Sequence, residues 1–181
     1  IQYAGITTEH LNVRNNVGIF DVSHMGEFLI SGPESTSFLN YICSNNIKNI
    51  KIGRAQYNLL INQNGGIIDD LIVYKTSNYE YMLVVNAANI KKDYDWIKKN
   101  INGFKCKIND KSDDLGLISV QGPNSTKLLN DVFKDVNIRE LSRFYFKKFE
   151  NRLKYKNEII ISKTGYTGSE GYEIYISNED I

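Results

Sequence analysis

The sequence predicts an α+β protein of two lobes, each a mainly antiparallel sheet with flanking helices. Segments with a strand pattern outnumber helical segments, and few long crossovers separate them, which favours antiparallel pairing. A strand-turn-helix motif occurs twice, at residues 30–40 and 120–130. At 181 residues, the chain is long enough for one large domain or two small ones. These three observations together favour two related lobes.

The repeated motif consists of a strand end, a Gly-Pro turn and the start of a helix. Ile30-Ser31-Gly32-Pro33-Glu34-Ser35-Thr36-Ser37-Phe38-Leu39-Asn40 is matched by Val120-Gln121-Gly122-Pro123-Asn124-Ser125-Thr126-Lys127-Leu128-Leu129-Asn130. The only two prolines of the chain occupy equivalent places, and proline is tolerated in the first turn of a helix because its missing N–H would be unpaired there anyway. We therefore expect one such unit in each lobe.

The other elements follow from local patterns. Residues 7–16 predict a helix with Thr7 or Thr8 as its N-cap and Gly18 as its stop, and residues 18–26 predict a compact turn. Alternating apolar residues predict strands at 27–30, 57–61, 67–74, 79–85, 104–108, 115–120, 144–149, 158–163 and 171–176.

Two adjacent acids, Asp69 and Asp70, interrupt the apolar strand at residues 67–74. Residues 64–66, Asn-Gly-Gly, are typical of a hairpin turn because they accept positive φ, so the acids belong to the second arm of a hairpin. The two side chains point to opposite faces of the sheet, and both faces are mostly apolar. A buried carboxylate costs free energy unless it is paired, hydrogen-bonded or protonated. The pattern indicates a functional acid but leaves open which of the two faces a ligand; for a single acid, a strand-end group tied to backbone N–H groups is the alternative.

Two further segments carry polar groups at strand ends. Asn86 precedes a predicted helix, and capping of that helix is the alternative to a ligand role. The loop at residues 164–173 has glycines spaced G-x-x-G-x-x-G, which matches neither the dinucleotide fingerprint nor a phosphate loop. Tyr166 and Glu173 of this segment can stack on a flat heterocycle and accept paired N–H donors from it, as a pterin or purine requires.

Composition excludes several classes of function. The net charge of +1 offers no polyanion footprint and gives nucleic-acid binding no support. Cys43 and Cys106 lie far apart and predict reduced thiols in an intracellular protein, and the two histidines give no basis for a His-based metal site. No apolar run approaches the roughly 20 residues of a membrane helix, so we expect a soluble protein. The chain starts at Ile1 rather than Met, and we expect it to be a piece of a longer protein.

Five motifs follow one another along the chain. They are GIFDVSHMGE at residues 18–27, GGIIDDLIV at 65–73, VVNAA at 84–88, QGP at 121–123, and TGYTG at 164–168 with GYE at 171–173. In this order they resemble the motifs of the glycine cleavage system T-protein, the tetrahydrofolate-dependent aminomethyltransferase family. Each motif alone is weak. Together they cover essentially the whole chain, which is therefore identified as a member of this family.

The resemblance implies a three-lobed protein with folate in a central channel. The first folate-binding lobe is expected to comprise residues 1–25 and 117–181, and the second residues 26–116. The third, barrel-like lobe and the Gly-Leu-Gly-Ala-Arg-Asp segment, whose Arg belongs to the folate site, are missing from this chain. We therefore expect these 181 residues alone to bind folate weakly and to be inactive.

The resemblance also implies site residues. Asp70 would be the catalytic acid, with Asp69 as the neighbour with which it could be confused, Glu173 would bind the pterin edge and Tyr166 would pack beside the ring. Phe144 stands where a Tyr can occur in the family, which keeps a packing face and loses a hydroxyl contact, so it is not included in the expected site. The remaining residues that would line the channel are Met25, Tyr57, Tyr74, Val85 and Asn86.

The implied reaction takes an aminomethyl group from the lipoyl arm of the H-protein, releases ammonia, and leaves 5,10-methylenetetrahydrofolate and the dihydrolipoyl protein. A carboxylate in a dry channel would stabilise the iminium-like cation that develops, because electrostatic effects grow as water is excluded. The implied co-substrate is tetrahydrofolate, without a metal. The implied partner is the lipoylated H-protein, with no nucleic acid or membrane. The protein would be a monomer, cytoplasmic in a bacterium or in the mitochondrial matrix of a eukaryote.

Three alternatives stay open. A folate-dependent demethylase, or the folate lobe of a sarcosine or dimethylglycine oxidising enzyme, would use the same scaffold with another donor. A folate-binding protein of RNA modification or cluster maintenance would bind folate without aminomethyl transfer. An inert interaction module would explain neither the paired acids nor the aromatic and acidic loop.

Overall fold

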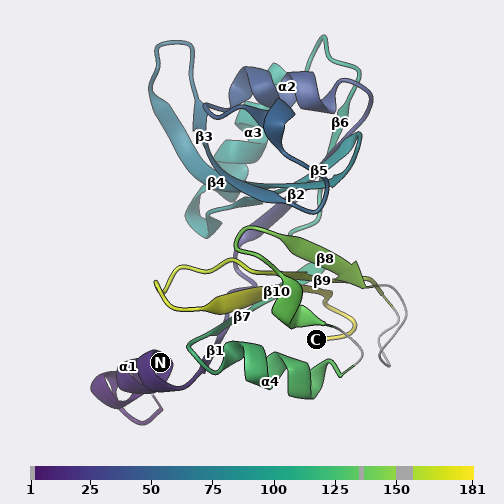
Figure 1. Cartoon of the computed structure of the whole chain (residues 1–181). Helices are drawn as coiled ribbons and strands as arrows, with labels where there is room; N and C mark the ends of the chain where they lie inside the picture. Colours follow the sequence, from purple (N-terminus) through teal and green to yellow (C-terminus); the bar gives the residue numbers. More distant parts are fainter. Residues whose placement is uncertain (1–2, 135–136, 150–156) are drawn as a thin grey trace. The chain divides into compact units, whose positions relative to one another are not determined.

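The computed structural model describes residues 3–134, 137–149 and 157–181 and has two compact units (Figure 1). Unit 1 comprises Ile1–Ser23 and Gly116–Ile181, and unit 2 comprises His24–Leu115. Within the described residues, each unit contains one five-stranded sheet with helices packed against it. The predicted α+β class is therefore confirmed.

Unit 2 is built on a sheet with the strand order β3-β4-β5-β2-β6, in which each strand pairs antiparallel with its neighbours. Its strands are β2 (Gly26–Ser31), β3 (Ala55–Ile61), β4 (Ile67–Ser77), β5 (Glu80–Val85) and β6 (Lys107–Asp110). Its helices are α2 (Ser35–Ile42), α3 (Ile90–Asn100) and the 3-10 turns η1 (Ile47–Asn49) and η2 (Ala87–Asn89). The predicted hairpin is formed by β3 and β4.

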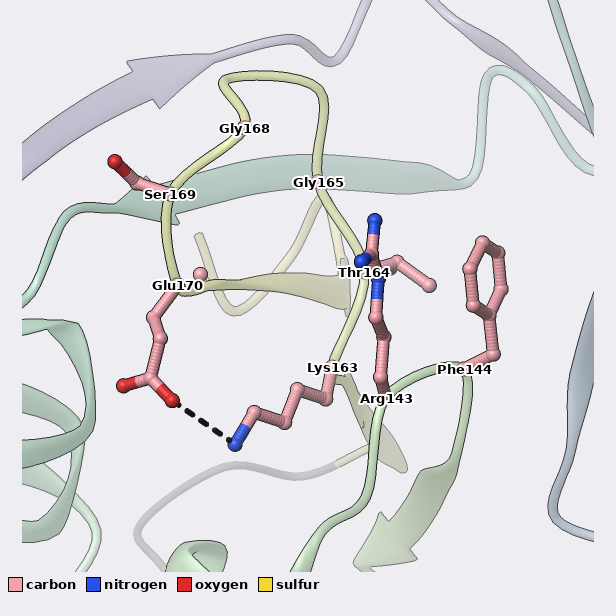
Figure 2. A pocket seen from close by; sticks show the side chains of 9 residues that line it. Arg143, Phe144, Lys163, Thr164, Gly165, Gly168, Ser169 and Glu170 are labelled. Carbon is pink, nitrogen blue, oxygen red and sulfur yellow. Dashed lines mark ion pairs between the residues drawn. The ribbon is translucent and has the colours of Figure 1, made fainter.

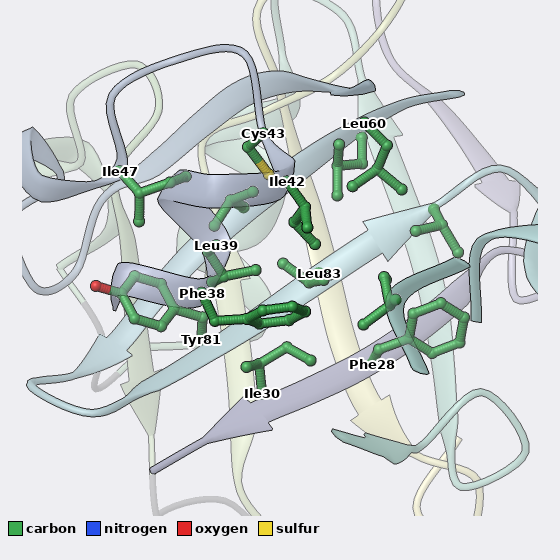
Figure 3. Packing of buried hydrophobic residues seen from close by; sticks show 14 of the residues in the cluster. Phe28, Ile30, Phe38, Leu39, Ile42, Cys43, Ile47, Leu60, Tyr81 and Leu83 are labelled. Atoms are coloured by element: carbon green, nitrogen blue, oxygen red, sulfur yellow. The ribbon is translucent and has the colours of Figure 1, made fainter. Parts of the chain in front are cut away.

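The two faces of this sheet differ in their cover. One row of paired residues, Val73, Leu83 and Phe28, belongs to the buried core. Side chains of α2 pack on that face, including Phe38 (Figure 3). Ile97 of α3 belongs to the same core. The neighbouring row, Tyr57, Ile72, Val84 and Glu27, lies on the opposite face, because side chains alternate along each strand. Helices therefore cover one face. The other face, called the helix-free face below, carries a mixture of apolar and acidic groups.

Unit 1 is built on a sheet with the strand order β1-β7-β10-β9-β8. Its strands are β1 (Gly18–Asp21), β7 (Leu115–Gln121), β8 (Phe146–Phe149), β9 (Ile159–Ser162) and β10 (Gly171–Ser177). Its helices are α1 (Ile6–Asn15), α4 (Ser125–Val132) and the 3-10 turn η3 (Ile138–Glu140). The core joins α4 and η3 to one face of the sheet, through Leu129, Ile138, Ile161 and Tyr172.

The predicted repeat lies at equivalent places in the two units. In each copy the turn begins with a glycine of positive φ, Gly32 at 138° and Gly122 at 131°, and ends in α2 or α4. The glycine carbonyl accepts the N–H of Ser35 in one copy, at 3.1 Å, and of Ser125 in the other, at 3.0 Å. Each proline precedes the N-cap residue instead of lying in the first helical turn, so each helix begins two residues after its proline.

The repeat extends to a tertiary contact that the sequence did not indicate. The hydroxyls of Thr36 and Tyr81 lie 2.7 Å apart in unit 2, and those of Thr126 and Tyr172 lie 3.0 Å apart in unit 1. Both tyrosines are fully buried, so each hydroxyl needs such a partner. A lysine Nζ also lies 5.6 Å from the centre of each tyrosine ring, from Lys75 and Lys163 respectively. The same arrangement of a threonine, a buried tyrosine and a lysine therefore occurs in both units.

Several predicted boundaries are wrong. The first helix begins at Ile6 after Gly5, whose φ is 103°, and Thr7 and Thr8 lie inside its first turn. The carboxylate of Glu9 accepts the N–H groups that precede the helix and thereby replaces a threonine cap. The turn predicted at residues 18–26 contains strand β1, and the strand predicted at 104–108 lies at Lys107–Asp110. In the part of the chain that the structure describes, no helix combines the length and apolar character needed to span a membrane.

Candidate functional site

The two acids of the hairpin point to opposite faces of the unit 2 sheet. Asp69 pairs with Leu60 and is 9% exposed, on the face that α2 and α3 cover. Asp70 pairs with Leu59 and is exposed, on the face that carries Ile72. A register shift between Leu60 and Ile61 precedes them. The alternation expected from the sequence therefore separates the two acids, and the exposed Asp70 is the one that a ligand on the helix-free face could reach.

Asn86 joins the two acids. Its Nδ2 lies 2.9 Å from Oδ1 and 3.1 Å from the carbonyl oxygen of Asp70, and 3.2 Å from each carboxylate oxygen of Asp69. Only the NH₂ end of the amide can face four acceptors, so these contacts fix its orientation. Leu71 pairs with Val85, and this register brings the next residue, Asn86, alongside Asp70.

The capping role considered for Asn86 is not observed. Asn86 does precede η2, and its carbonyl accepts the N–H of Asn89 at 2.9 Å. Its side chain makes no capping hydrogen bond with the described residues. The amide is therefore available for the acids, and the structure favours a role in the site over a role in the helix.

A third acid, Asp93 of α3, lies behind Asp69. Asp93 is fully buried, and neither of its carboxylate oxygens has a hydrogen-bond partner among the described residues. Its neighbour is the carboxyl of Asp69, and a hydrogen bond between the two needs a proton on one of them. Burial, together with the proximity and charge of the Asp69 carboxyl, raises the pKa of Asp93 to about 7. Burial also disfavours the charged form of Asp69, but hydrogen bonds from Asp93, Asn89 and Asn86 outweigh it and lower the pKa of Asp69.

A fourth acid, Glu27 of β2, lies in the row of Val84 and Ile72 on the helix-free face of the sheet. Its side chain is fully buried, and neither carboxylate oxygen has a hydrogen-bond partner among the described residues. Burial, with a smaller contribution from the Asp110 charge, raises the pKa of Glu27 to about 8. The group is therefore mostly a neutral acid at neutral pH.

The other predicted channel residues of unit 2 divide between the two faces. Tyr57 and Tyr74 share the face of Asp70, and Tyr57 is 52% exposed. Val85 instead belongs to the core beneath α2 and α3, so its side chain points away from Asp70. Its neighbour Val84 lies on the helix-free face. Met25, just before β2, is half-buried. The predicted lining role of Val85 is not supported by this placement, because adjacent strand residues face opposite sides.

Unit 1 holds a cavity of about 390 Å³ beside the glycine-rich loop (Figure 2). Its wall is formed by Arg143, Phe144 and the segments around Lys163 and Glu170, and Lys163 forms an ion pair with Glu170 at 3.5 Å. The glycines of the loop leave the cavity open and add no side chains of their own. A flat, polar molecule could contact both the aromatic ring of Phe144 and the charged groups around it.

Glu173 lies on β10 next to this cavity and is held by a wall residue. The hydroxyl of Thr164, which lines the cavity, donates to Oε2 of Glu173 at 2.5 Å and lies 3.0 Å from Ser162 Oγ. Glu173 is half-buried and pairs with Ser162 across the sheet. Tyr166 extends fully into solvent from the loop. Neither Glu173 nor Tyr166 is therefore part of the cavity wall, but Glu173 is tied to that wall through Thr164.

Gln121, the first residue of the QGP motif, fixes the glycine-rich loop. Its side chain is buried, its Nε2 donates to the carbonyl oxygen of Thr164 at 3.3 Å, and its Oε1 accepts the hydroxyl of Thr167 at 3.0 Å. A Cβ at Gly165 or Gly171 would lie 2.2 Å from Gln121 Oε1. These two glycines are therefore needed for the close approach of the amide, not for their φ angles.

Sequence reasoning missed Asp93, Glu27, Arg143 and Lys163. The spacing Asn89–Asp93 on an amphipathic helix carried a signal, since an acid on the buried stripe with Ile90 and Ile97 must find a partner. Arg143 and Lys163 gave no signal of a site in the sequence, because dispersed lysines and arginines are usually surface groups. The structure also returns Phe144 to the candidate site, at the cavity wall and with a φ of 62°.

The chain was compared with known proteins. Residues 2–181 match the family model described as the GCVT N-terminal domain. The chain is 48% identical to an aminomethyltransferase of Listeria innocua and 44% identical to one of Staphylococcus epidermidis, each over 180 residues. In both cases 99% of this chain is aligned with 49% of the relative, so the chain spans about half the length of the curated relatives it matches.

Two solved structures are similar. The glycine cleavage system aminomethyltransferase T from Bartonella henselae matches with a TM-score of 0.84 and 33% identity, over 95% of this chain and 45% of that one. A heterotetrameric sarcosine oxidase from Corynebacterium matches with a TM-score of 0.61 and 13% identity, over 94% of this chain and 82% of that one, which shows a shared fold alone. The resemblance identified from the sequence motifs is confirmed. The chain belongs to the GCVT N-terminal domain family.

Proposed function

We propose that the protein is the aminomethyltransferase of a glycine cleavage system, with tetrahydrofolate as its co-substrate. The observation that carries the proposal is Asp70, an exposed acid on the sheet face without helices, held by Asn86 at 2.9 Å. Membership of the GCVT family and relatives named aminomethyltransferase support the same activity. The relatives with that name are about twice as long as this chain.

The proposed reaction begins with an aminomethyl group on a lipoyl thiol of the H-protein. The first folate nitrogen would take up the methylene carbon as ammonia leaves, and expulsion of the lipoyl sulfur would then make the carbon iminium-like on that nitrogen. The second folate nitrogen would close the methylene bridge, and the two folate N–H protons would leave with the ammonia and with the lipoyl thiol. Asp70 would stabilise the developing cation and orient the attacking nitrogen, because a fixed carboxylate acts strongly where water is excluded. Asn86 would keep that carboxylate in place through its amide.

We propose a separate role for the unit 1 cavity in binding the pterin ring of folate. Glu173, oriented by Thr164, would accept paired N–H groups from the pterin edge. Phe144 would contact the ring face, and Tyr166 would pack on it from the loop once the ligand is present. Arg143 and Lys163 would bring positive charge to the same wall, where they suit the carboxylates of the folate tail.

The deciding experiment measures ammonia release by the full-length protein, supplied with aminomethylated lipoyl carrier protein, with and without tetrahydrofolate. Fast release that requires folate is the expected result. Folate binding without folate-dependent release would contradict the proposal and favour a demethylase, which takes another donor, or a folate-binding protein without transferase activity. Assays with sarcosine and dimethylglycine as donors would then separate these two.

The 181 residues alone are proposed to bind tetrahydrofolate weakly and not to turn over, because they span about half of the relatives' length. Calorimetric titration of this chain and of the full-length protein tests the point. Equal affinities would contradict it.

We also propose that the protein is a monomer that binds the lipoylated H-protein. Size-exclusion chromatography with and without the carrier protein would test both parts.

A further inference from the structure

The Asp93 side chain is a buried acid without an ordinary partner. It lies on α3, is 0% exposed, and neither of its oxygens has a hydrogen-bond partner among the described residues. Its neighbour is another carboxyl, that of Asp69 on β4. Two buried carboxylates in contact repel each other, whereas one proton between them converts the contact into a strong hydrogen bond.

The charges around the pair favour a proton on Asp93. From β4, the charges of Asp69 and Asp70 both raise the pKa of Asp93, while Lys92 of α3 opposes them. Lys92 Nζ donates to the carbonyl oxygen of Ile68 at 2.7 Å, so its position is fixed to the same strand. Asp69, which also accepts from Asn86 and Asn89, is the better anion. The proton therefore belongs mainly to the helix side of the pair, although the two groups titrate together.

The pair is connected to Asp70 through one amide. Asn86 Nδ2 lies 3.2 Å from both oxygens of Asp69 and 2.9 Å from Oδ1 of Asp70. An amide nitrogen has two hydrogens, and here they are shared between the carboxylate of Asp69 and the carbonyl oxygen and Oδ1 of Asp70. The orientation of Asp69 depends in turn on the hydrogen bond from Asp93. Asp93, Asp69, Asn86 and Asp70 thus follow one another from the buried side of α3 to the helix-free face of the sheet.

We propose that Asp93 is a positioning residue whose carboxylic acid donates a hydrogen bond to Asp69, and that this bond holds Asn86 and thereby the Asp70 carboxylate. No proton needs to travel from Asp93 to Asp70, and Asp93 touches no substrate. The part of the proposal that concerns turnover rests on the function proposed for Asp70. The shared proton and the fixed amide do not depend on that function.

The proposal predicts a specific pH dependence. Folding raises the pKa of Asp93 from its ordinary value of 3.8 to about 7, so the folded protein holds an additional proton between these values. The hydrogen bond is complete at low pH and is lost as the pH rises through about 7. Above that pH, repulsion between Asp93 and Asp69 would loosen Asn86, and turnover would fall with kcat affected before the KM for folate.

The test compares three variants of the full-length protein. Asp93→Asn keeps a donor to Asp69 but cannot ionise, so it should keep turnover within a few-fold and lose the alkaline fall. Asp93→Leu fills the space without a donor and should lower kcat by about 10- to 100-fold with little change in KM. Asp95→Asn, on the exposed side of the same helix where Asp95 pairs with Lys91, should behave as wild type.

Two readouts that need no activity accompany the kinetics. Infrared spectra below pH 7 should show a protonated carboxyl band that Asp93→Asn removes, separate from the band of the neutral Glu27, which Glu27→Gln removes. The side-chain amide of Asn86 should shift in NMR spectra for Asp93→Leu but not for Asp93→Asn. If Asp93→Asn removes no protonated carboxyl band from the wild-type spectrum, the shared proton is overturned. An unshifted amide, or an Asp93→Leu variant with wild-type kcat, would overturn the positioning role. If the wild type itself transfers no aminomethyl group, the proposed function fails, and the band and the amide shift alone decide the positioning role.

Discussion

Asn86 Nδ2 lies 2.9 Å from Oδ1 of Asp70, and this contact gives a residue at a helix start a role on the sheet. The same nitrogen contacts Asp69 on the other face, so a single side chain donates hydrogen bonds to both acids. An adjacent pair of acids on a strand would otherwise be independent, because their side chains diverge. The Asn86 amide therefore couples the positions of the two carboxylates.

Asp70→Asn is predicted to lower kcat for folate-dependent ammonia release by about 10²- to 10³-fold, because it removes the charge that stabilises the cationic carbon. The shape of the side chain is kept, so the affinity for folate should change little. Single-turnover kinetics and calorimetric titration measure the two effects. Asp114→Asn, which removes an exposed acid paired with Lys111, serves as the charge-matched control. A variant that keeps near-normal turnover would refute the role of Asp70.

Asn86→Leu is predicted to destabilise the folded protein by about 1–3 kcal/mol, because it leaves Asp69 and Asp70 without their common donor. Urea unfolding monitored by tyrosine and tryptophan fluorescence measures the change. The control is Asn137→Leu, which removes a 2.7 Å amide contact to Glu140 at an exposed site and should cost less than about 0.5 kcal/mol. Equal costs at the two sites would show that the acids do not depend on Asn86.

Glu27→Gln is predicted to stabilise the protein at alkaline pH only. Folding raises the pKa of Glu27 from its ordinary value of 4.5 to about 8, so the folded state binds more protons between these values and stability falls as the pH rises through them. Glutamine stays neutral, so the variant should match the wild type near pH 5 and exceed it by about 1–3 kcal/mol near pH 9. Melting temperatures across that range provide the measurement, and parallel curves for the two proteins would contradict the prediction.

Gly32→Ala and Gly122→Ala are each predicted to destabilise their own unit by more than about 2 kcal/mol, because positive φ and a steric clash add together. A Cβ would lie 2.4 Å from the Lys105 carbonyl oxygen in the first case and 2.4 Å from that of Asn16 in the second. Gly103→Ala, at φ 94° with nothing within 4 Å of the Cβ, should cost only about 1 kcal/mol of conformational strain. Urea unfolding of the three variants tests whether close approach, beyond φ alone, requires glycine in the repeat.

Prediction from the sequence worked best where a pattern is local. The Asn-Gly-Gly turn placed the acids on the second arm of the hairpin, and strand alternation separated Asp69 from Asp70, as the structure confirms. It did less well at element ends. The helix near the N-terminus is capped by Glu9 from within the helix, and the threonines that a capping rule selects lie in its first turn.

The sequence by itself determined the α+β class, the repeated Gly-Pro turn and the family, because each depends on residue types at short, fixed spacings. Only the tertiary structure decided which side chains meet. Asp93 reaches Asp69 because α3 packs over β4, and Glu27 is a neutral acid because its surroundings exclude water. Val85 points into the core because the register of β5 leaves it no other face. Burial and partnership are properties of the packed chain, and they decide what an acidic side chain can do.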